Sequence, residues 1–205
     1  MGNIDKTALF KIGYGLYAVT CNDGVKDNGL IVNTVMQISD TPVRISVTIN
    51  KANYSHDVIM NTRKMNVCVL SEKTPFEIFE KLGFHSGRDT DKLKDVDHWT
   101  ASNGLALISC EYTNAFMLLD VVDTIDFGSH TMFVCEITES MSCTDEPTMT
   151  YAYYHANVKP KPNAKKKGYV CKICGYVHEG DSLPEDFVCP WCKHSSDYFE
   201  PIIEA

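Results

Sequence analysis

Four of the nine cysteines lie close together near the C-terminus and have the spacing of metal ligands. They form two C-x-x-C pairs, Cys171 with Cys174 and Cys189 with Cys192. Each pair can bend around one ion, and two pairs complete a tetrahedron of sulfur ligands, which is typical of zinc or iron. Gly175 permits a turn that brings backbone N–H groups toward the sulfurs. The residues therefore predict a four-cysteine metal centre, either a structural zinc ribbon or a redox-active iron site.

The sequence around these pairs resembles the rubredoxins. The stretches C-x-x-C-G-Y at 171–176 and L-P-x-D-F-x-C-P-x-C at 183–192 match the two signatures of that family. The residues that match its aromatic core are Tyr169, Tyr176, Phe187 and Phe199. The resemblance implies one iron per chain, held by the four cysteines. Fourteen residues separate the pairs, about half the gap of free-standing rubredoxins, as in the shortened modules fused to other redox proteins.

A lysine-rich segment separates this module from the rest of the chain. Residues 157–167 hold five lysines, two prolines and no acidic residue, whereas the part from Gly168 onward holds seven acidic residues and two lysines. Such a shift in composition marks a linker. We therefore expect one domain at 1–156, a linker at 157–167 and a second domain at 168–205.

The composition argues against several kinds of partner. The net charge is −8, and nucleic-acid phosphates require a basic protein face. No segment approaches the roughly 18 consecutive apolar residues of a membrane span, and residues 1–12 are too polar for a secretory signal. We therefore expect a cytoplasmic protein that binds neither nucleic acid nor a membrane.

The N-terminal domain has the pattern of a mainly β protein. Runs rich in β-branched and aromatic residues predict strands at 14–21, 43–50, 65–71, 106–112, 116–125 and 132–138. Helices are expected around 7–12, from about Ser55, and at 74–82. For the last helix, Thr74 is the predicted N-cap, Pro75 the first residue and Glu77 the partner in a capping box. Many strands and few helices indicate an antiparallel barrel.

Three polar clusters contain residues that could bind an anion. They are N-G-L-I-V-N-T at 28–34, N-K-A-N-Y-S-H at 50–56 and S-G-R-D-T-D-K at 86–92, and each is expected to follow a strand. The second opens a helix, and a helix N-terminus beside lysine, arginine and hydroxyl groups attracts anions. An ordinary helix cap would have the same residues, so the residues alone leave both interpretations open.

These clusters, in this order, resemble the flavin-reductase-like, FMN-binding split barrels. The matching stretches are G-L-Y-A-V-T at 15–20, the first and third clusters, I-N-K-A-N-Y-S at 49–55, S-H-T-M-F-V-C-E at 129–136 and M-T-Y-A-Y-Y-H at 149–155. The resemblance implies a homodimer with FMN at the interface. The residues implied to bind FMN are Asn33, Thr34, Asn50, Lys51, Asn53, Tyr54, Ser55, Ser86, Arg88, Lys92 and His130.

The resemblance also implies a role for most of these residues. Asn33 and Thr34 would contact the ring or the ribityl chain. The residues that would meet the ribityl chain and the phosphate are Lys51, Asn53 and Ser55, with Arg88 and Lys92 adding charge at the phosphate. His130 would lie near the isoalloxazine, and a hydrogen-bonded turn histidine is the alternative.

The whole chain resembles the high-molecular-weight rubredoxins. This resemblance implies that electrons pass from NAD(P)H, directly or through a reductase, via FMN to an Fe(Cys)4 centre and on to an acceptor such as a flavodiiron oxygen or nitric oxide reductase. The eleven-residue linker could reach at most about 36–40 Å, enough for the iron module to move between flavin and partner. Two alternatives stay open: an NAD(P)H:flavin oxidoreductase that releases reduced flavin, and a zinc-ribbon interaction module without electron transfer.

Overall fold

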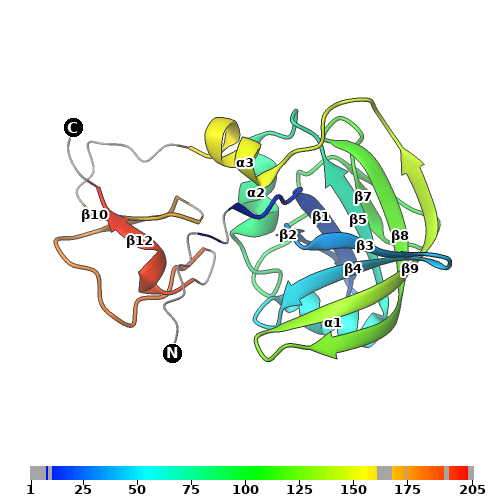
Figure 1. The fold of residues 1–205 in the computed structure, drawn as a ribbon, viewed down its shortest axis with the longest axis horizontal. Coiled ribbons are helices and arrows are strands. Elements are labelled where there is room, and N and C mark those ends of the chain that lie inside the picture. Colours follow the sequence, from blue (N-terminus) through cyan, green and yellow to red (C-terminus); the bar gives the residue numbers. More distant parts are fainter. Residues whose placement is uncertain (1–7, 9–10, 161–167, 174, 192–193, 203–205) are drawn as a thin grey trace.

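The protein is mainly β, and its largest feature is one seven-stranded antiparallel sheet (Figure 1). The computed structural model describes residues 8, 11–160, 168–173, 175–191 and 194–202. The strand order is β2-β1-β5-β8-β9-β4-β3. The strands are β1 (Tyr17–Asn22), β2 (Asp27–Val32), β3 (Val35–Asp40), β4 (Val43–Asn50), β5 (Lys64–Leu70), β8 (Thr113–Asp126) and β9 (His130–Ser142).

The two edge strands of this sheet are neighbours in the chain. β2 ends at Val32 and β3 begins at Val35, so only Asn33 and Thr34 connect the two edges. Three Cα–Cα steps reach at most about 11 Å, and the sheet therefore has to curl until its edges come together. The result is a rolled sheet that is open between β2 and β3, with Asn33 and Thr34 at the opening.

Alternate residues along the strands face two apolar clusters. One cluster receives side chains from all seven strands and from helix α1 (Tyr54–Thr62), so it is the interior of the rolled sheet. Residues of the opposite parity on β1, β5 and β8 pack in a second cluster with helix α2 (Phe76–Gly83). These three strands are thus buried on both faces. Phe133 is fully buried in the interior, where truncation to alanine costs about 3–5 kcal/mol.

The predicted strands are present, with shifted ends. The run at 106–112 contains only the short strand β7 (Ala106–Ile108), which pairs with β6 (His98–Thr100). β2, β3 and β6 were not predicted. β2 contains the turn-prone Asn28 and Gly29, and most residues of β3 are exposed. The helix expected from about Ser55 is α1, and half of the residues of the helix expected around 7–12 lie outside the described residues. Among the described helices, none is long and apolar enough to cross a membrane.

The capping box predicted for α2 was wrong. The helix begins at Phe76, and Pro75 is its N-cap without a side-chain cap hydrogen bond. The Thr74 hydroxyl instead donates to the carbonyls of Ser71 at 2.7 Å and Tyr112 at 2.8 Å. Thr74 therefore ties the loop before α2 to the turn before β8.

The C-terminal part forms a second, smaller sheet. Its order is β11-β10-β12, and its strands are β10 (Gly168–Cys171), β11 (Val177–Glu179) and β12 (Phe199–Pro201). The chain leaves the large domain through α3 (Tyr151–Tyr153) and the π-helical turn η2 (Tyr154–Val158), and the 3-10 turn η3 (Ser196–Tyr198) precedes β12. Figure 1 shows the small sheet beside the side of the large domain that carries α2 and α3.

Candidate functional site

A cavity of about 410 Å³ opens where β2 and β3 meet. Its polar side is lined by Asn33, Thr34, Thr48, Asn50 and, at the start of β9, His130. The Thr34 hydroxyl donates to the Thr48 carbonyl at 2.6 Å, and the Thr48 N–H donates back to the Thr34 carbonyl at 3.1 Å. Asn50 and His130 are directly paired between β4 and β9. Strand pairing therefore fixes the backbone of this polar side.

Aromatic rings of the large domain form the opposite wall. Phe79 of α2, Phe84 just after α2, and Tyr154 of η2 all line the cavity. The rings of Phe79 and Tyr154 pack 4.6 Å apart at 46°. A cavity with aromatic walls and a few fixed polar groups suits a planar organic cofactor.

The C-terminal module supplies a further wall of the same cavity. Its contribution consists of Ile173, Trp191, His194 and Tyr198. The Trp191 ring stacks on the Phe84 ring, with centroids 5.2 Å apart and planes 10° apart. The cavity is therefore shared between the large domain and the metal module.

The position of His130 is compatible with both predictions from the sequence, a hydrogen-bonded turn histidine and a residue near the flavin ring. Its Nδ1 forms a hydrogen bond of 2.8 Å with the Ser129 hydroxyl, as expected for a turn histidine. It also lines the cavity. Burial lowers the pKa of His130, and electrostatic repulsion from the His194 imidazole of the module lowers it further. The neutral imidazole is thereby favoured at this wall.

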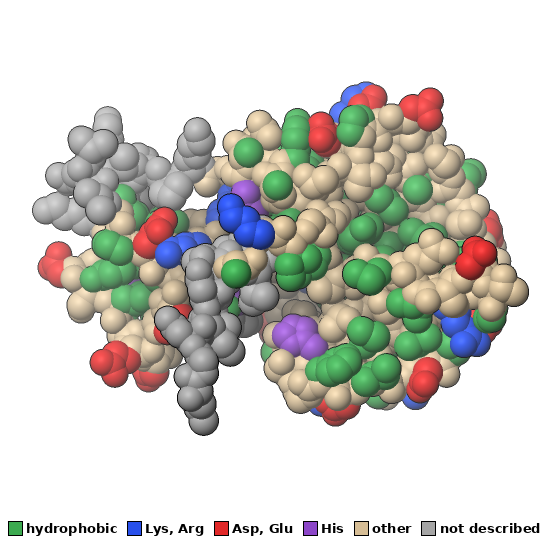
Figure 2. Space-filling view, in the orientation of Figure 1, with side chains coloured by type: hydrophobic (Ala, Val, Ile, Leu, Met, Phe, Trp, Pro, Cys, Tyr) green, Lys and Arg blue, Asp and Glu red, His purple; other side chains and the backbone are tan. Residues whose placement is uncertain are grey.

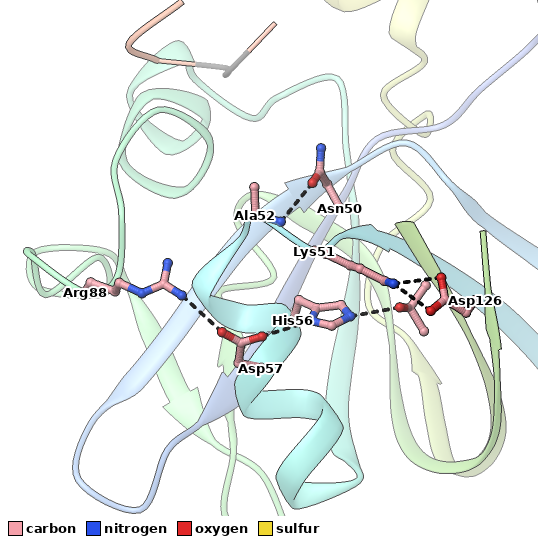
Figure 3. A network of polar contacts seen from close by, with 8 residues as sticks. Asn50, Lys51, Ala52, His56, Asp57, Arg88 and Asp126 are labelled. Atoms are coloured by element: carbon pink, nitrogen blue, oxygen red, sulfur yellow. Dashed lines mark hydrogen bonds and ion pairs between the residues drawn. The ribbon is translucent and has the colours of Figure 1, made fainter. Parts of the chain in front are cut away.

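A polar network surrounds the first turn of α1 (Figure 3). Lys51 Nζ lies 2.6 Å from Asp126 Oδ2, and the Arg88 guanidinium lies 3.0 Å from Asp57. The guanidinium also lies over the ring of Tyr54, 5.2 Å from its centroid. These three predicted residues do not line the cavity itself. They lie at the start of α1, where each cation is paired with a carboxylate.

The hydroxyls of Ser55 and Ser86 accept hydrogen bonds from other groups of the protein. Buried Ser55 accepts a hydrogen bond from Asn28 Nδ2 at 2.7 Å, and the Ser86 hydroxyl accepts one from the Arg88 N–H at 3.2 Å. The Asn28 Oδ1 atom is buried and has no hydrogen-bond partner in the described part of the chain. It lies against Gly87, where a Cβ would approach it to 2.1 Å. The loop after α2 and the start of α1 therefore meet at the buried Asn28 side chain.

Lys92, which the resemblance placed at the phosphate, is bonded within the protein. It is 7% exposed, and its ammonium donates to the carbonyls of Gly29 at 2.7 Å and Leu82 at 2.6 Å. Burial lowers its pKa to about 8. Lys92 thus connects β2 to the end of α2 through two backbone carbonyls.

The residues present fit a flavin that carries a phosphate. Asn53 is the N-cap of α1, lines the cavity, and makes no side-chain cap hydrogen bond. The helix N-terminus can therefore accept an anion, with Lys51 and Arg88 nearby. Asn33 and Thr34 place polar groups at the opening, and the aromatic wall suits a planar ring. Asn33, Thr34, Asn50, Asn53 and His130 are the predicted residues that the structure brings to the cavity.

The first cysteines of the two pairs have matching surroundings. Cys171 and Cys189 are both completely buried. The N–H of Cys171 donates to the Tyr176 carbonyl and that of Cys189 to the His194 carbonyl, both at 2.8 Å and both five residues ahead. Gly175 has a φ of +83°, the left-handed conformation that its predicted turn requires. Cys171 and Cys189 therefore make equivalent backbone hydrogen bonds in the described part of the module.

The chemistry of this module fits a metal bound by sulfur. Two buried thiols with matched surroundings supply half of a tetrahedral ligand set, and the predicted ligands Cys174 and Cys192 lie outside the described residues. The rings of Tyr176, Phe187, Trp191 and Phe199 pack together with centroid distances of 5.3–6.4 Å. Iron and zinc both accept such a sulfur set.

The aromatic residues of the cavity were not predicted. Phe79 has the pattern of an ordinary apolar helix face, and Phe84 belongs to no motif. Tyr154 lies in the matching stretch at 149–155, but no role was predicted for it. One signal was available for Trp191. A large apolar ring between two metal ligands in so small a module requires another surface to cover it.

The fold and the two sites define a class of protein. Residues 9–161 match the flavin reductase like domain family, and residues 169–200 match the rubrerythrin, rubredoxin-like domain family. The chain belongs to the flavin reductase-like family and carries a rubredoxin-like domain at its C-terminal end.

Two relatives extend this assignment. The chain is 32% identical to the high molecular weight rubredoxin of Moorella thermoacetica, over 97% of this chain and 100% of the relative. It is 35% identical to the ferric-chelate reductase (NAD(P)H) of Archaeoglobus fulgidus, over 77% of this chain and 93% of the relative. The first similarity spans both domains.

Solved structures share the fold of the large domain. The NADH:FAD oxidoreductase of Streptomyces globisporus C-1027 has a TM-score of 0.64 at 18% identity, covering 73% of this chain and 92% of that one. Flavoredoxin from Methanosarcina acetivorans has a TM-score of 0.61 at 20% identity, covering 69% and 75%.

Proposed function

We propose that this protein carries electrons from a bound FMN to a four-cysteine iron centre on the same chain. The observation that supports this most is the shared cavity. Trp191 stands between Cys189 and Cys192 in the sequence, and its ring stacks on Phe84 in the cavity wall. Electron transfer requires the two groups to lie close together, and a common wall supplies that proximity.

Residues at the start of α1 and around the cavity would hold the flavin. The N-terminus of α1, with Lys51 and Arg88 beside it, would bind the phosphate. Asn33 and Thr34 would offer polar groups to the ring and the ribityl chain. Phe84 and Trp191 would cover the cavity and keep water away from the ring.

The four cysteines would hold the iron. A bound flavin accepts two electrons as hydride and releases them singly, whereas a tetrathiolate iron exchanges one electron at a time. The chain's contribution is to bury Cys171 and Cys189 and to hold their turns against the large domain. This arrangement suits a converter between two-electron and one-electron carriers.

Electrons would enter from NAD(P)H, directly or through a separate reductase. The similarity to a ferric-chelate reductase (NAD(P)H) supports this donor. The acceptor would be a flavodiiron oxygen or nitric oxide reductase, as the resemblance to the high-molecular-weight rubredoxins implies. The module has seven acidic residues against two lysines, so a basic patch on such a partner would speed the encounter.

A homodimer is the proposed assembly. Large apolar side chains with at least 45% exposure lie on the β3–β4 and β8–β9 hairpins: Met36, Ile38, Val43, Ile125 and Phe127. Figure 2 shows apolar side chains over the face formed by these strands. A second copy would cover them. Sedimentation velocity of the chain and of a Met36→Asp/Phe127→Asp variant tests this, since the variant should sediment as a monomer.

An absorption spectrum with metal analysis tests the cofactors. Protein produced with ample iron and FMN should show flavin bands, ferric–thiolate absorption and about one iron per chain. Zinc in place of iron under these conditions would support the interaction-module alternative. Steady NADH oxidation that depends on added free flavin would support the flavin reductase alternative.

A further inference from the structure

Lys159 connects the large domain to the first cysteine turn. It directly follows η2, and its ammonium reaches across to the metal module. There it donates to the carbonyl of Lys172 at 2.6 Å and to that of Ile173 at 3.0 Å. These are the two residues between Cys171 and Cys174. A side chain of the large domain is thus fastened to the backbone of the metal-binding turn.

The Lys159 ammonium stabilises negative charge at the first cysteine turn. In a trans peptide the carbonyl and the N–H point in opposite directions. A cation on the carbonyls of Lys172 and Ile173 therefore polarises the N–H groups on the other side of the same peptide units. Polarised N–H groups, and the positive charge itself, stabilise additional negative charge on nearby thiolates. One added electron makes the net charge of a tetrathiolate site more negative by one, so both effects favour the reduced state.

The contact depends on the docked position of the module. Lys159 is the third residue of the predicted linker, but its N–H donates to the carbonyl of Tyr154 in η2 at 2.8 Å, which fixes it to the large domain. Residues 160–167 separate it from the module in sequence. A second contact, the stack of Trp191 on Phe84, holds the other cysteine turn. When the module leaves the cavity, both contacts end together.

We propose that Lys159 sets the reduction potential of the metal centre according to the position of the module. This inference rests on the proposed function. In the docked position the raised potential favours transfer of one electron from the reduced flavin to the ferric centre, a step that breaks no bond and moves no proton. After undocking the potential falls, and the reduced centre becomes a stronger donor to an acceptor protein.

The test is a mediated spectroelectrochemical titration of the iron-loaded full chain. Lys159→Met should lower the equilibrium constant for iron reduction about tenfold, which is a potential lower by about 59 mV for one electron. Lys159→Arg, which keeps the charge, should stay within about threefold of the unchanged protein. Lys172→Met is a matched control on the same turn, because its ammonium is exposed and lies 3.4 Å from Glu200. It should also change the constant less than about threefold.

A second variant keeps the test decisive if the first binds iron poorly. Phe84→Ala leaves the metal module unaltered, weakens docking, and should lower the potential in the same direction. Unchanged potentials in both Lys159→Met and Phe84→Ala would overturn the inference. The titration measures the iron centre through external mediators, so it remains informative even if the flavin fails to reduce the iron, which is the separate failure of the proposed function.

Discussion

The Trp191 ring lies parallel to the Phe84 ring, with centroids 5.2 Å apart and planes 10° apart. Phe84 follows α2 in the large domain, and Trp191 lies in the second cysteine turn of the metal module. Both rings line the cavity at the opening of the rolled sheet. This single stack therefore links the candidate flavin pocket, the metal centre and the relative position of the two domains.

Removing the Phe84 ring should slow electron transfer within the chain. Phe84→Ala loses a stacked pair and its buried area, roughly 1–2 kcal/mol of docking energy. The rate of iron reduction by reduced flavin, followed by stopped-flow absorption, should fall about 5–30-fold. Phe76→Ala is the matched control, because that ring packs 5.9 Å from Phe84 on the large-domain side. Equal rates for the two variants would argue against docking through this stack.

Lys51 should bind the flavin phosphate in exchange for Asp126. Lys51→Met should weaken FMN binding about tenfold, since a charge-assisted hydrogen bond is lost. Asp126→Asn frees the lysine and should leave FMN binding equal or tighter. Isothermal titration with FMN and with riboflavin, which lacks the phosphate, provides the comparison. A similar loss for both ligands in Lys51→Met would contradict a phosphate contact.

Lys92 should act on stability and not on flavin binding. Lys92→Met leaves the carbonyls of Gly29 and Leu82 without their donor in a buried position. Urea unfolding of flavin-free protein should show a loss of about 2–4 kcal/mol. Unchanged stability together with weaker FMN binding would instead restore the phosphate role expected from the sequence.

His155 should make the folded protein less stable in acid. Burial, with a contribution from Lys159, lowers its pKa from 6.5 to about 4, and its Nε2 is buried without a partner among the described residues. The unfolded chain therefore takes up a proton before the folded one does. The stabilising contribution is complete above about pH 6.5 and is lost as the pH falls toward about 4.

The measurement for His155 is unfolding free energy against pH. His155→Phe keeps a ring against Tyr151, whose centroid lies 4.5 Å away, but cannot titrate. Its stability should fall less steeply than that of the unchanged protein between about pH 6.5 and 4. Parallel curves would show that His155 does not contribute to this slope.

Local patterns in the sequence predicted much of this architecture. The C-x-x-C spacing and Gly175 describe a turn within a few residues, and the strands followed from their composition. The partners of the charged residues could not be predicted in this way. Lys51 pairs with Asp126, 75 residues away, and Lys92 bonds to Gly29, 63 residues away. Such contacts depend on how the sheet curls, and the Phe84–Trp191 contact depends on how two domains dock.

In the proposed function, electrons pass from flavin to iron within one chain. Its most direct test is anaerobic reduction of the FMN- and iron-loaded protein, by NADH or by photoreduction of the bound flavin, with both absorption bands followed in time. The ferric–thiolate band should bleach after the flavin band, at a rate independent of protein concentration. A flavin that becomes fully reduced while the ferric–thiolate band persists, or bleaches only in proportion to protein concentration, would contradict it.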